Sequence, residues 1–207
     1  MLNDGLEDRK TALNELSAAT SKGRERRRAL HDAVTQTCHE FHGLGVEMGQ
    51  RYSGFGVYDA DETVPYTCQG KASQDPVLYY EPNTYPGCRL PHVWLNRAVP
   101  GEPVSTIDLA GHGAFTLFTG IGGSLWKGAA DSICKELAVP LRVYSIGFRQ
   151  EWEDMYYDWE RVMGVDESGA VLVRPDRFVA WRAAEVLDSV ETCEKKLLHV
   201  LRCVLGR

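Results

Sequence analysis

The half of the chain after Pro103 alternates between strand-like and helix-like patterns, and this alternation restricts the possible folds. "VSTIDL" and "FTLFTG" have the composition of strands, residues 125–137 have helical spacing, and "LRVYSIG" is again strand-like. An acidic aromatic helical stretch follows, "EWEDMYYDWERVMG", and then a hairpin pair, "AVLVRP" and "FVAWR". An amphipathic helix over 183–205 ends the chain. The predicted order is β-β-α-β-(α)-β-β-α.

This order predicts an α/β fold with a thioredoxin-like domain, in which flanking helices cover a central mixed sheet. The pattern contains a strand-helix-strand unit followed by a hairpin and a terminal helix. In such a fold the chemistry lies between the first core strand and its helix, here "TGIGGSLW" at 119–126. That loop has no cysteine to become a thiolate, so we do not expect thiol-disulfide exchange.

The first fifty residues have a different character, with apolar residues recurring at intervals of three to four. They are Leu6, Leu13 and Leu16, then Leu30, Val34, Cys38 and Phe41. We predict two helices that break at Ser21-Lys22-Gly23. From Gly43 to Pro103 the chain is rich in Gly, Pro and Tyr, which indicates irregular coil with brief strands. The predicted domains are therefore an N-terminal helical segment (1–50), a coil linker (51–103) and the thioredoxin-like domain (104–207).

Composition restricts the class of partner. The 207 residues are 43% hydrophobic and 25% charged, enough for a core, and the formal net charge of −6 argues against general binding to nucleic acid or an anionic membrane. The basic run "RERRR" at 24–28 is interpreted as a solvated helix face. No apolar run of about 18 residues exists, and "MLNDG" does not resemble a signal peptide. We predict a soluble, cytoplasmic protein.

The six cysteines are scattered without a Cys-x-x-Cys pair, so we predict free, mostly buried thiols and neither a zinc site nor a redox centre. They are Cys38, Cys68, Cys88, Cys134, Cys193 and Cys203.

Four ordered blocks carry a family resemblance: "LGVEMGQRYSG", "YEPNTYPGCRLPHVWL", "STIDLAGHGAFTLFTG" and "VLVRPDRFVAWR". They resemble the C-terminal part of FAD-dependent aromatic hydroxylases of the phenol and chlorophenol monooxygenase type. The similarity runs from about residue 25 to about residue 182. It implies a thioredoxin-like C-terminal domain, preceded by the helix and linker that leave the flavin domain.

Two departures from that family bear on function. Those hydroxylases bind FAD through a Gly-x-Gly-x-x-Gly turn and a Gly-Asp-Ala-Ala-His-like segment, and this chain has neither. "GIGG" at 120–123 lacks the spacing and context of a nucleotide loop, so we expect no cofactor. The family hairpin usually turns on Asp-Gly, whereas here the turn is Pro175-Asp176-Arg177, where arginine has a steric cost at positive φ.

Histidines provide the catalytic candidates. His39 and His42 lie three residues apart on a predicted helix, within reach of one metal ion or of a pocket as general acid or base. The alternative is that they cap the helix or bond to a neighbouring loop, and we predict no metal site. His92 is held between Pro91 and Val93, in a segment that fits either a binding site or a linker that packs in one way.

Five further residues are candidates for binding a substrate: Tyr52, Tyr80, Arg89, Trp94 and Asp108. Asp108 could pair with His112, although "AGHGA" reads first as a loop between strands. The aromatic cluster Trp152, Tyr156, Tyr157 and Trp159 is predicted to be core plus solvated face, with a partner-contacting patch as the alternative.

Two functional hypotheses follow. The first is a flavin-free, stand-alone remnant whose apolar cleft binds a hydrophobic biosynthetic intermediate and promotes a cofactor-independent cyclisation, cycloaddition or isomerisation. The second is a non-catalytic module, or a fragment, that forms a homodimer or docks on a flavin-dependent monooxygenase. The retained helix and linker favour the enzyme, because they supply enough chain to close a pocket.

Overall fold

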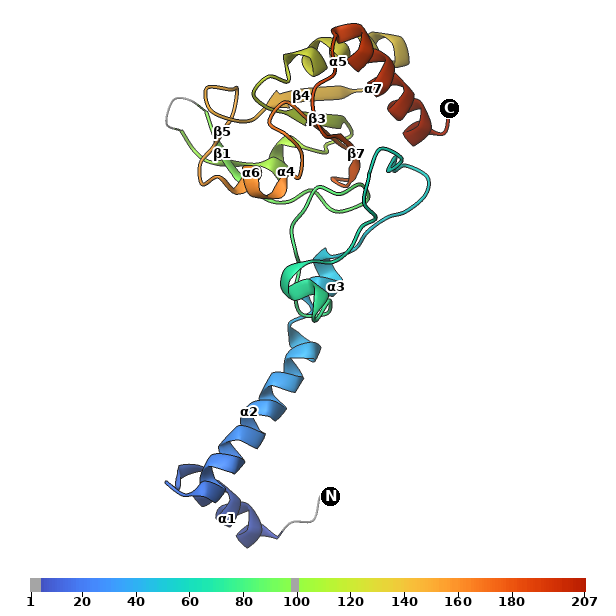
Figure 1. Ribbon diagram of the computed structural model, residues 1–207. Helices are drawn as coiled ribbons and strands as arrows, with labels where there is room; N and C mark the ends of the chain where they lie inside the picture. The colour runs from blue at the N-terminus through green and yellow to red at the C-terminus, as the bar shows by residue number, and fades with distance from the viewer. Residues whose placement is uncertain (1–4, 98–100) are drawn as a thin grey trace.

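The computed structural model describes residues 5–97 and 101–207, and in it a helical arm extends away from an α/β body (Figure 1). Residues 1–4, on which the absence of a signal peptide was judged, lie outside the described residues. The body contains two sheets, one of three strands in the order β2-β1-β5 and one of four strands in the order β4-β3-β6-β7. The predicted class, a mixed sheet with flanking helices after an N-terminal helical segment, is confirmed.

The arm consists of α1 (Leu6–Ser17) and α2 (Ser21–Phe41), and α3 (Leu44–Met48) lies where it meets the body (Figure 1). The predicted break at Ser21-Lys22-Gly23 is wrong by three residues. Thr20 caps α2 by accepting the N–H of Gly23, so those residues form the first helical turn instead. A Cβ on Gly23 would lie 2.3 Å from the carbonyl oxygen of Ala18, so glycine is what lets the two helices approach so closely.

The segment between the arm and the body is mostly irregular, as predicted, with one 3-10 turn, η1 (Gly70–Ser73). Its last residues form β1 (Trp94–Asn96), the centre of the small sheet. None of the helices within 5–97 and 101–207 is long and apolar enough to cross a membrane.

The four-stranded sheet has the predicted strand-helix-strand unit followed by a hairpin. Its strands are β3 (Phe115–Thr119), β4 (Leu141–Ser145), β6 (Ala170–Val173) and β7 (Val179–Ala183). The crossover helix α5 (Ser124–Leu137) makes β3 and β4 parallel, whereas β6 runs antiparallel to both β3 and β7. This arrangement places β3 and β6 at the centre.

Three elements differ from their predictions. "VSTIDL" is a two-residue strand, β2 (Val104–Ser105), followed by the short helix α4 (Thr106–Leu109), because the Ser105 hydroxyl and the Asp108 carboxylate form a capping box. The acidic aromatic stretch contains β5 (Glu153–Asp154) before the short helix α6 (Asp158–Val162). The last helix, α7 (Val190–Leu205), begins after its cap, Ser189, rather than at 183.

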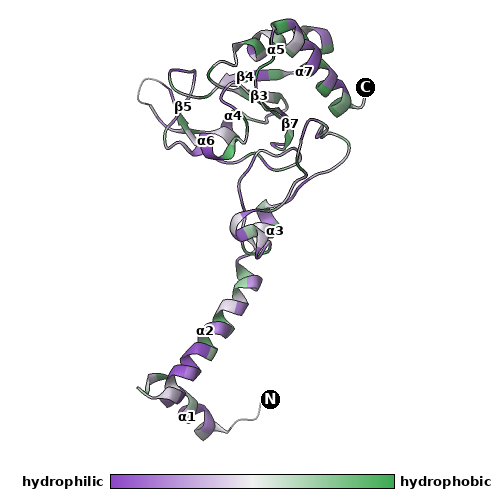
Figure 2. Cartoon of the chain, viewed as in Figure 1, coloured by the Kyte–Doolittle hydropathy of each residue, from purple (hydrophilic) through white to green (hydrophobic). Residues whose placement is uncertain are grey.

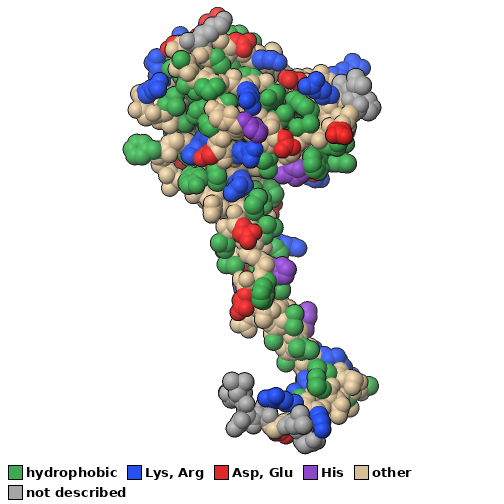
Figure 3. All heavy atoms as spheres, turned by 180° about the vertical axis from the view of Figure 1, so that it is seen from behind, with side chains coloured by type: hydrophobic (Ala, Val, Ile, Leu, Met, Phe, Trp, Pro, Cys, Tyr) green, Lys and Arg blue, Asp and Glu red, His purple; other side chains and the backbone are tan. Residues whose placement is uncertain are grey.

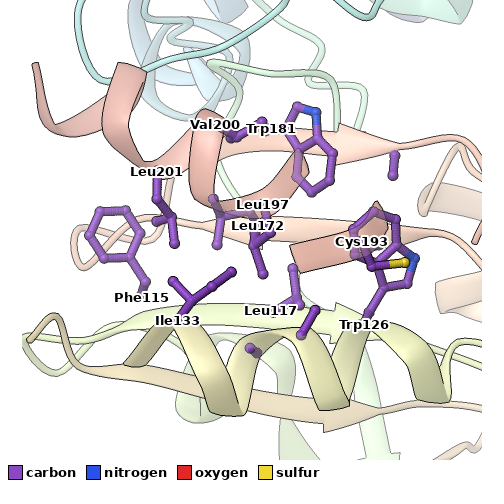
Figure 4. Packing of buried hydrophobic residues seen from close by; sticks show 14 of the residues in the cluster. Phe115, Leu117, Trp126, Ile133, Leu172, Trp181, Cys193, Leu197, Val200 and Leu201 are labelled. Atoms are coloured by element: carbon purple, nitrogen blue, oxygen red, sulfur yellow. The ribbon is translucent and has the colours of Figure 1, made fainter. Parts of the chain in front are cut away.

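The four-stranded sheet is buried on both faces. On one face α5 and α7 pack over the sheet, and Figure 4 shows Trp126 and Ile133 of α5 opposite Leu197 and Leu201 of α7. The other face, which includes Phe118 of β3, is covered by residues of the linker, of the segment before β5 and of α6. They include Leu90, Val93, Leu95, Trp152 and Trp159. The linker therefore contributes to the core as well as connecting the arm to the body, while the predicted boundaries at 50 and 103 stay predictions.

The turn of the β6–β7 hairpin has the strain expected from its sequence. Arg177 has φ +69°, in the left-handed region that a non-glycine residue seldom occupies. Its guanidinium Nε donates to the carbonyl oxygen of Ala110 at 3.3 Å, which holds the turn against the end of α4.

Leu197 tests the core between α5 and α7, because its side chain is completely buried there. We expect Leu197→Ala to lower the free energy of unfolding by about 2–5 kcal/mol through lost burial and an unfilled cavity. Lys195→Ala, at an exposed position of the same helix, is expected to change it by less than about 0.5 kcal/mol. Urea unfolding of both variants measures the difference, and equal losses would contradict this packing.

Candidate functional site

The eight predicted site residues fall into three separate places. His39 lies near the body-proximal end of α2, where its Nε2 is 2.7 Å from the Asp75 carboxylate. The backbone N–H of Leu78 and the His39 ring lower the pKa of Asp75. His42 is the C-terminal cap residue of α2, and its backbone N–H donates to the carbonyl oxygen of Cys38. In the described parts of the chain no group of three His, Cys, Asp or Glu side chains could hold a metal ion.

A second group surrounds Phe178 at the start of the last strand. The ring of Tyr52 lies 4.5 Å from that of Phe178, and the Arg89 guanidinium lies 5.2 Å from the same ring. Tyr80 belongs to this neighbourhood, where burial raises its pKa to about 12, with Cys88 adding to the rise and Arg89 opposing it. The Nε of Arg89 is buried without a hydrogen-bond partner in the described chain.

A third group surrounds Ser105. The His92 Nδ1 lies 2.7 Å from the Ser105 hydroxyl, and the His92 ring packs edge-on against Trp94 at 4.6 Å. Asp108 accepts the backbone N–H of Ser105 at 3.1 Å, which is its capping role in α4. His112 bonds to the carbonyl oxygen of Asp108 rather than to its carboxylate, so the loop interpretation of "AGHGA" holds there.

Among the described residues, two cavities of about 380 and 280 Å³ are better enclosed than two wide, open hollows of about 580 and 690 Å³, and none of the eight residues lines any of the four. The cavity of about 380 Å³ is a polar cleft between the linker, the region of α6 and β7. Arg182 spans it with a two-pronged ion pair to Glu62 at 2.6 and 2.7 Å, and the guanidiniums of Arg182 and Arg51 each lie 5.1 Å from the Tyr85 ring. Sequence reasoning missed this cluster because its members are up to 131 positions apart and share no motif.

The smaller cavity, of about 280 Å³, lies beside the loop 119–126 that the fold prediction singled out. We call it the carboxylate-rimmed cavity, and its lining comes from four segments of the body. The lining residues are Ile121, Ile146, Gly147, Phe148, Glu153, Asp154, Tyr157, Trp159, Glu160, Met163 and Glu167. The aromatic cluster of 152–159 has one buried and one exposed part, as predicted. Trp152 and Trp159 belong to the core, whereas Tyr156 and Tyr157 are exposed.

Comparison with known proteins identifies the chain. Residues 83–207 match the family model for the aromatic-ring hydroxylase C-terminal region. The chain belongs to this family. The resemblance of the four sequence blocks to that region is thereby confirmed.

Relatives in this hydroxylase family are much longer than the chain. It is 39% identical over 171 residues to a phenol 2-monooxygenase of Pseudomonas sp. (strain EST1001), which covers 83% of this chain and 27% of that protein. It is 38% identical over 181 residues to a 2,4-dichlorophenol 6-monooxygenase of Cupriavidus pinatubonensis (strain JMP 134 / LMG 1197), covering 87% of this chain and 29% of that one. The chain thus spans little more than a quarter of these hydroxylases.

A solved structure of a hydroxylase relative extends the match to the arm. The flavin-dependent monooxygenase PieE, solved in complex with FAD and substrate, superposes with a TM-score of 0.78 at 37% identity. The match covers 99% of this chain and 33% of PieE. Arm, linker and body together therefore correspond to one region of a flavin-dependent monooxygenase.

All six cysteines are free, as predicted, but the expectation that most are buried is wrong. Cys88 and Cys193 are buried, Cys68 and Cys203 are exposed, and the other two are intermediate. Burial raises the pKa of the Cys88 thiol, which leaves little thiolate at neutral pH. The cysteine in "YPGCRLPHVWLN" is thus a core residue.

Thiol labelling tests this distribution. With a maleimide at pH 7, we expect Cys68 and Cys203 to react about tenfold or more faster than Cys88, because access and thiolate fraction both favour them. Mass spectrometry of tryptic peptides at successive times gives the rates, and labelling in urea is the control in which all six react. Fast labelling of Cys88 in the folded protein would contradict its placement.

Proposed function

We propose that this chain is a docking region of a flavin-dependent aromatic hydroxylase, and that its arm packs on the flavin-binding part of such an enzyme. The observation that carries the proposal is an apolar stripe on α2 that the described residues leave uncovered. It consists of Leu30, Val34, Cys38 and Phe41, and the side chains of Leu30, Val34 and Phe41 are 50%, 56% and 77% exposed.

The stripe has the geometry of a contact surface. Its members recur at intervals of four, four and three, so they lie on one side of a helix. Along the 21 residues of α2 the only buried one is Gly23, at the turn from α1. Figure 3 shows hydrophobic side chains exposed along the arm among scattered charged and histidine side chains, and Figure 2 shows that hydrophilic residues predominate near the start of α2. Helices of this kind gain most of their stability by packing an apolar face, and nothing in the described chain covers this one.

The comparisons support a flavin-binding partner for this surface. PieE matches the chain over 99% of its length, arm included, and was solved in complex with FAD. The sequence here has no Gly-x-Gly-x-x-Gly turn of its own. An exposed apolar stripe in a chain that has no Gly-x-Gly-x-x-Gly turn supports docking on a separate flavin-binding part.

The other functional prediction, cofactor-independent cyclisation, cycloaddition or isomerisation of a hydrophobic intermediate, stays a prediction. His39, His42 and His92 line neither cavity, so no observation favours it over docking. The homodimer and the cytoplasmic location also stay predictions.

A chimaera tests docking. The region of the Pseudomonas phenol 2-monooxygenase that this chain matches is replaced by the chain, so that the flavin-binding part and the arm are held at high effective concentration. We expect amide hydrogen exchange in α2 to slow by about tenfold or more relative to the chain alone, because docking suppresses local opening. Mass spectrometry of peptides covering 21–41 measures it.

A matched pair of variants makes the result specific to the stripe. Val34→Asp places a charge within the stripe and is expected to return the α2 exchange of the chimaera to the rate of the free chain. Gln36→Asp adds the same charge at an exposed position on the opposite side of the helix and is expected to leave the protection in place. Equal exchange in the free and fused chains, or equal effects of the two variants, would overturn the docking proposal.

A further inference from the structure

The carboxylate-rimmed cavity lies where α/β proteins commonly bind ligands. The parallel strands β3 and β4 both end beside it, at Thr119 and Ser145, and the chain continues into its walls through Ile121 and Ile146. Crevices at the carboxyl ends of parallel strands are favoured ligand sites because the loops that leave them diverge there. The position therefore singles out this cavity before its chemistry is considered.

Glycines hold the walls of the cavity close together. A Cβ on Gly120 would lie 2.5 Å from the carbonyl oxygen of Glu167, and a Cβ on Gly147, at φ +143°, would lie 3.1 Å from the Ile121 side chain. No other residue allows these approaches without displacing a wall. The shape of the cavity is thus built into the backbone.

The inner surface of the cavity is apolar and its mouth is aromatic. Ile121, Ile146, Trp159 and Met163 contribute to the lining, and Trp159 is only 4% exposed. Phe148 and Tyr157 also line it, yet their side chains are 72% and 71% exposed. Tyr157 has φ +57°, a strained conformation for a bulky residue. Two aromatic rings are therefore presented to solvent beside an apolar hollow.

The charged side chains that line this hollow are all acidic. Four carboxylates line it, from Glu153, Asp154, Glu160 and Glu167, and no Lys, Arg or His does. The Asp154 carboxylate is occupied, since it accepts the backbone N–H groups of Asp158 and Glu160 at the start of α6. The Arg149 guanidinium stacks 5.3 Å from the Phe148 ring, outside the lining set.

Two of the four carboxylates are available to a ligand. Glu153 accepts a long hydrogen bond, 3.4 Å, from the backbone N–H of Arg149. The side chains of Glu160 and Glu167 are exposed and have no hydrogen bond or ion pair within the described residues. A cation at the mouth would meet these carboxylates and the faces of the aromatic rings, which attract positive charge.

We propose that the carboxylate-rimmed cavity binds a small organic amine, with its apolar part inside and its ammonium group at the mouth between Glu160, Glu167 and the exposed aromatic rings. The volume, about 280 Å³, is just below the range of about 300–1,000 Å³ for pockets that hold drug-sized ligands and suits a one-ring molecule. The carboxylates repel anions, and a neutral aromatic molecule gains burial without the electrostatic attraction. The site is separate from the apolar stripe, so it does not depend on the docking proposal.

Three probes of similar shape and different charge test this site on the full chain. Phenethylamine is expected to bind with a Kd of about 1 mM or below, while 2-phenylethanol and phenylacetate bind at least about tenfold more weakly. Titration followed by protein NMR gives the affinities, and the shifted signals should include those of Ile121, Phe148 and Tyr157. Amine binding should weaken as salt is raised, because the mouth is open to solvent.

Variants separate this site from general attraction to an acidic protein. The double variant Glu160→Gln, Glu167→Gln is expected to weaken amine binding about tenfold. Its control, Glu25→Gln, Glu40→Gln, removes the same charge from exposed positions on the arm and should bind as the parent chain does. Phe148→Ala, at an exposed position that folding does not require, should also weaken binding. Equal affinity for amine and alcohol, equal effects of the two double variants, or no amine binding at tens of millimolar would overturn the proposal.

Discussion

The burial of β3 on both faces is the constraint on which the rest of the body depends. All five of its residues are buried, and its apolar side chains divide between two cores, with Phe115 and Leu117 toward α5 and α7 and Phe118 toward the opposite side. A central strand without a solvated face needs two covering layers. The helices α5 and α7 supply the layer on one face of the sheet. The layer on the opposite face is completed by residues of the linker.

The need for a second covering layer explains why the linker segment 85–96, "YPGCRLPHVWLN", packs as part of the body. Leu90, Val93 and Leu95 are almost completely buried against the second face. Thr106 fixes this segment, since its hydroxyl donates to the carbonyl oxygen of Pro91 at 2.6 Å and accepts the N–H of Val93 at 3.1 Å. His92 and Trp94 alternate outward between these core residues, so their exposure is a consequence of strand geometry. The family model, which matches residues 83–207, likewise begins within the linker, ahead of this segment.

The parts of this structure that were predictable are those that depend on local pattern. Ala170–Val173 is apolar throughout, and Val179–Ala183 is apolar except for Arg182, because these strands are buried on both faces; both were recognised as strands. α4 was missed because the Ser105 and Asp108 side chains compete for the backbone in a stretch with strand-like composition. The cavities were missed for another reason. Residues as distant in sequence as Ile121 and Glu167 come together only because of the strand order in the sheet, so no sequence spacing predicts the cavity that they line.

The arm and the cavity make different demands on a partner. The arm is fixed to the linker at one end, where His39 bonds to Asp75 and where Gly45 packs so tightly that a Cβ would lie 2.0 Å from the carbonyl oxygen of Pro76. Such an anchor sets the direction of α2, and the docking proposed for its apolar stripe would require an extended surface on the partner. The cavity, walled by glycine-limited loops and rimmed by carboxylates, accepts one small cation and needs no such surface. Because the two sites share no residue and lie on different elements, occupation of one does not require the other.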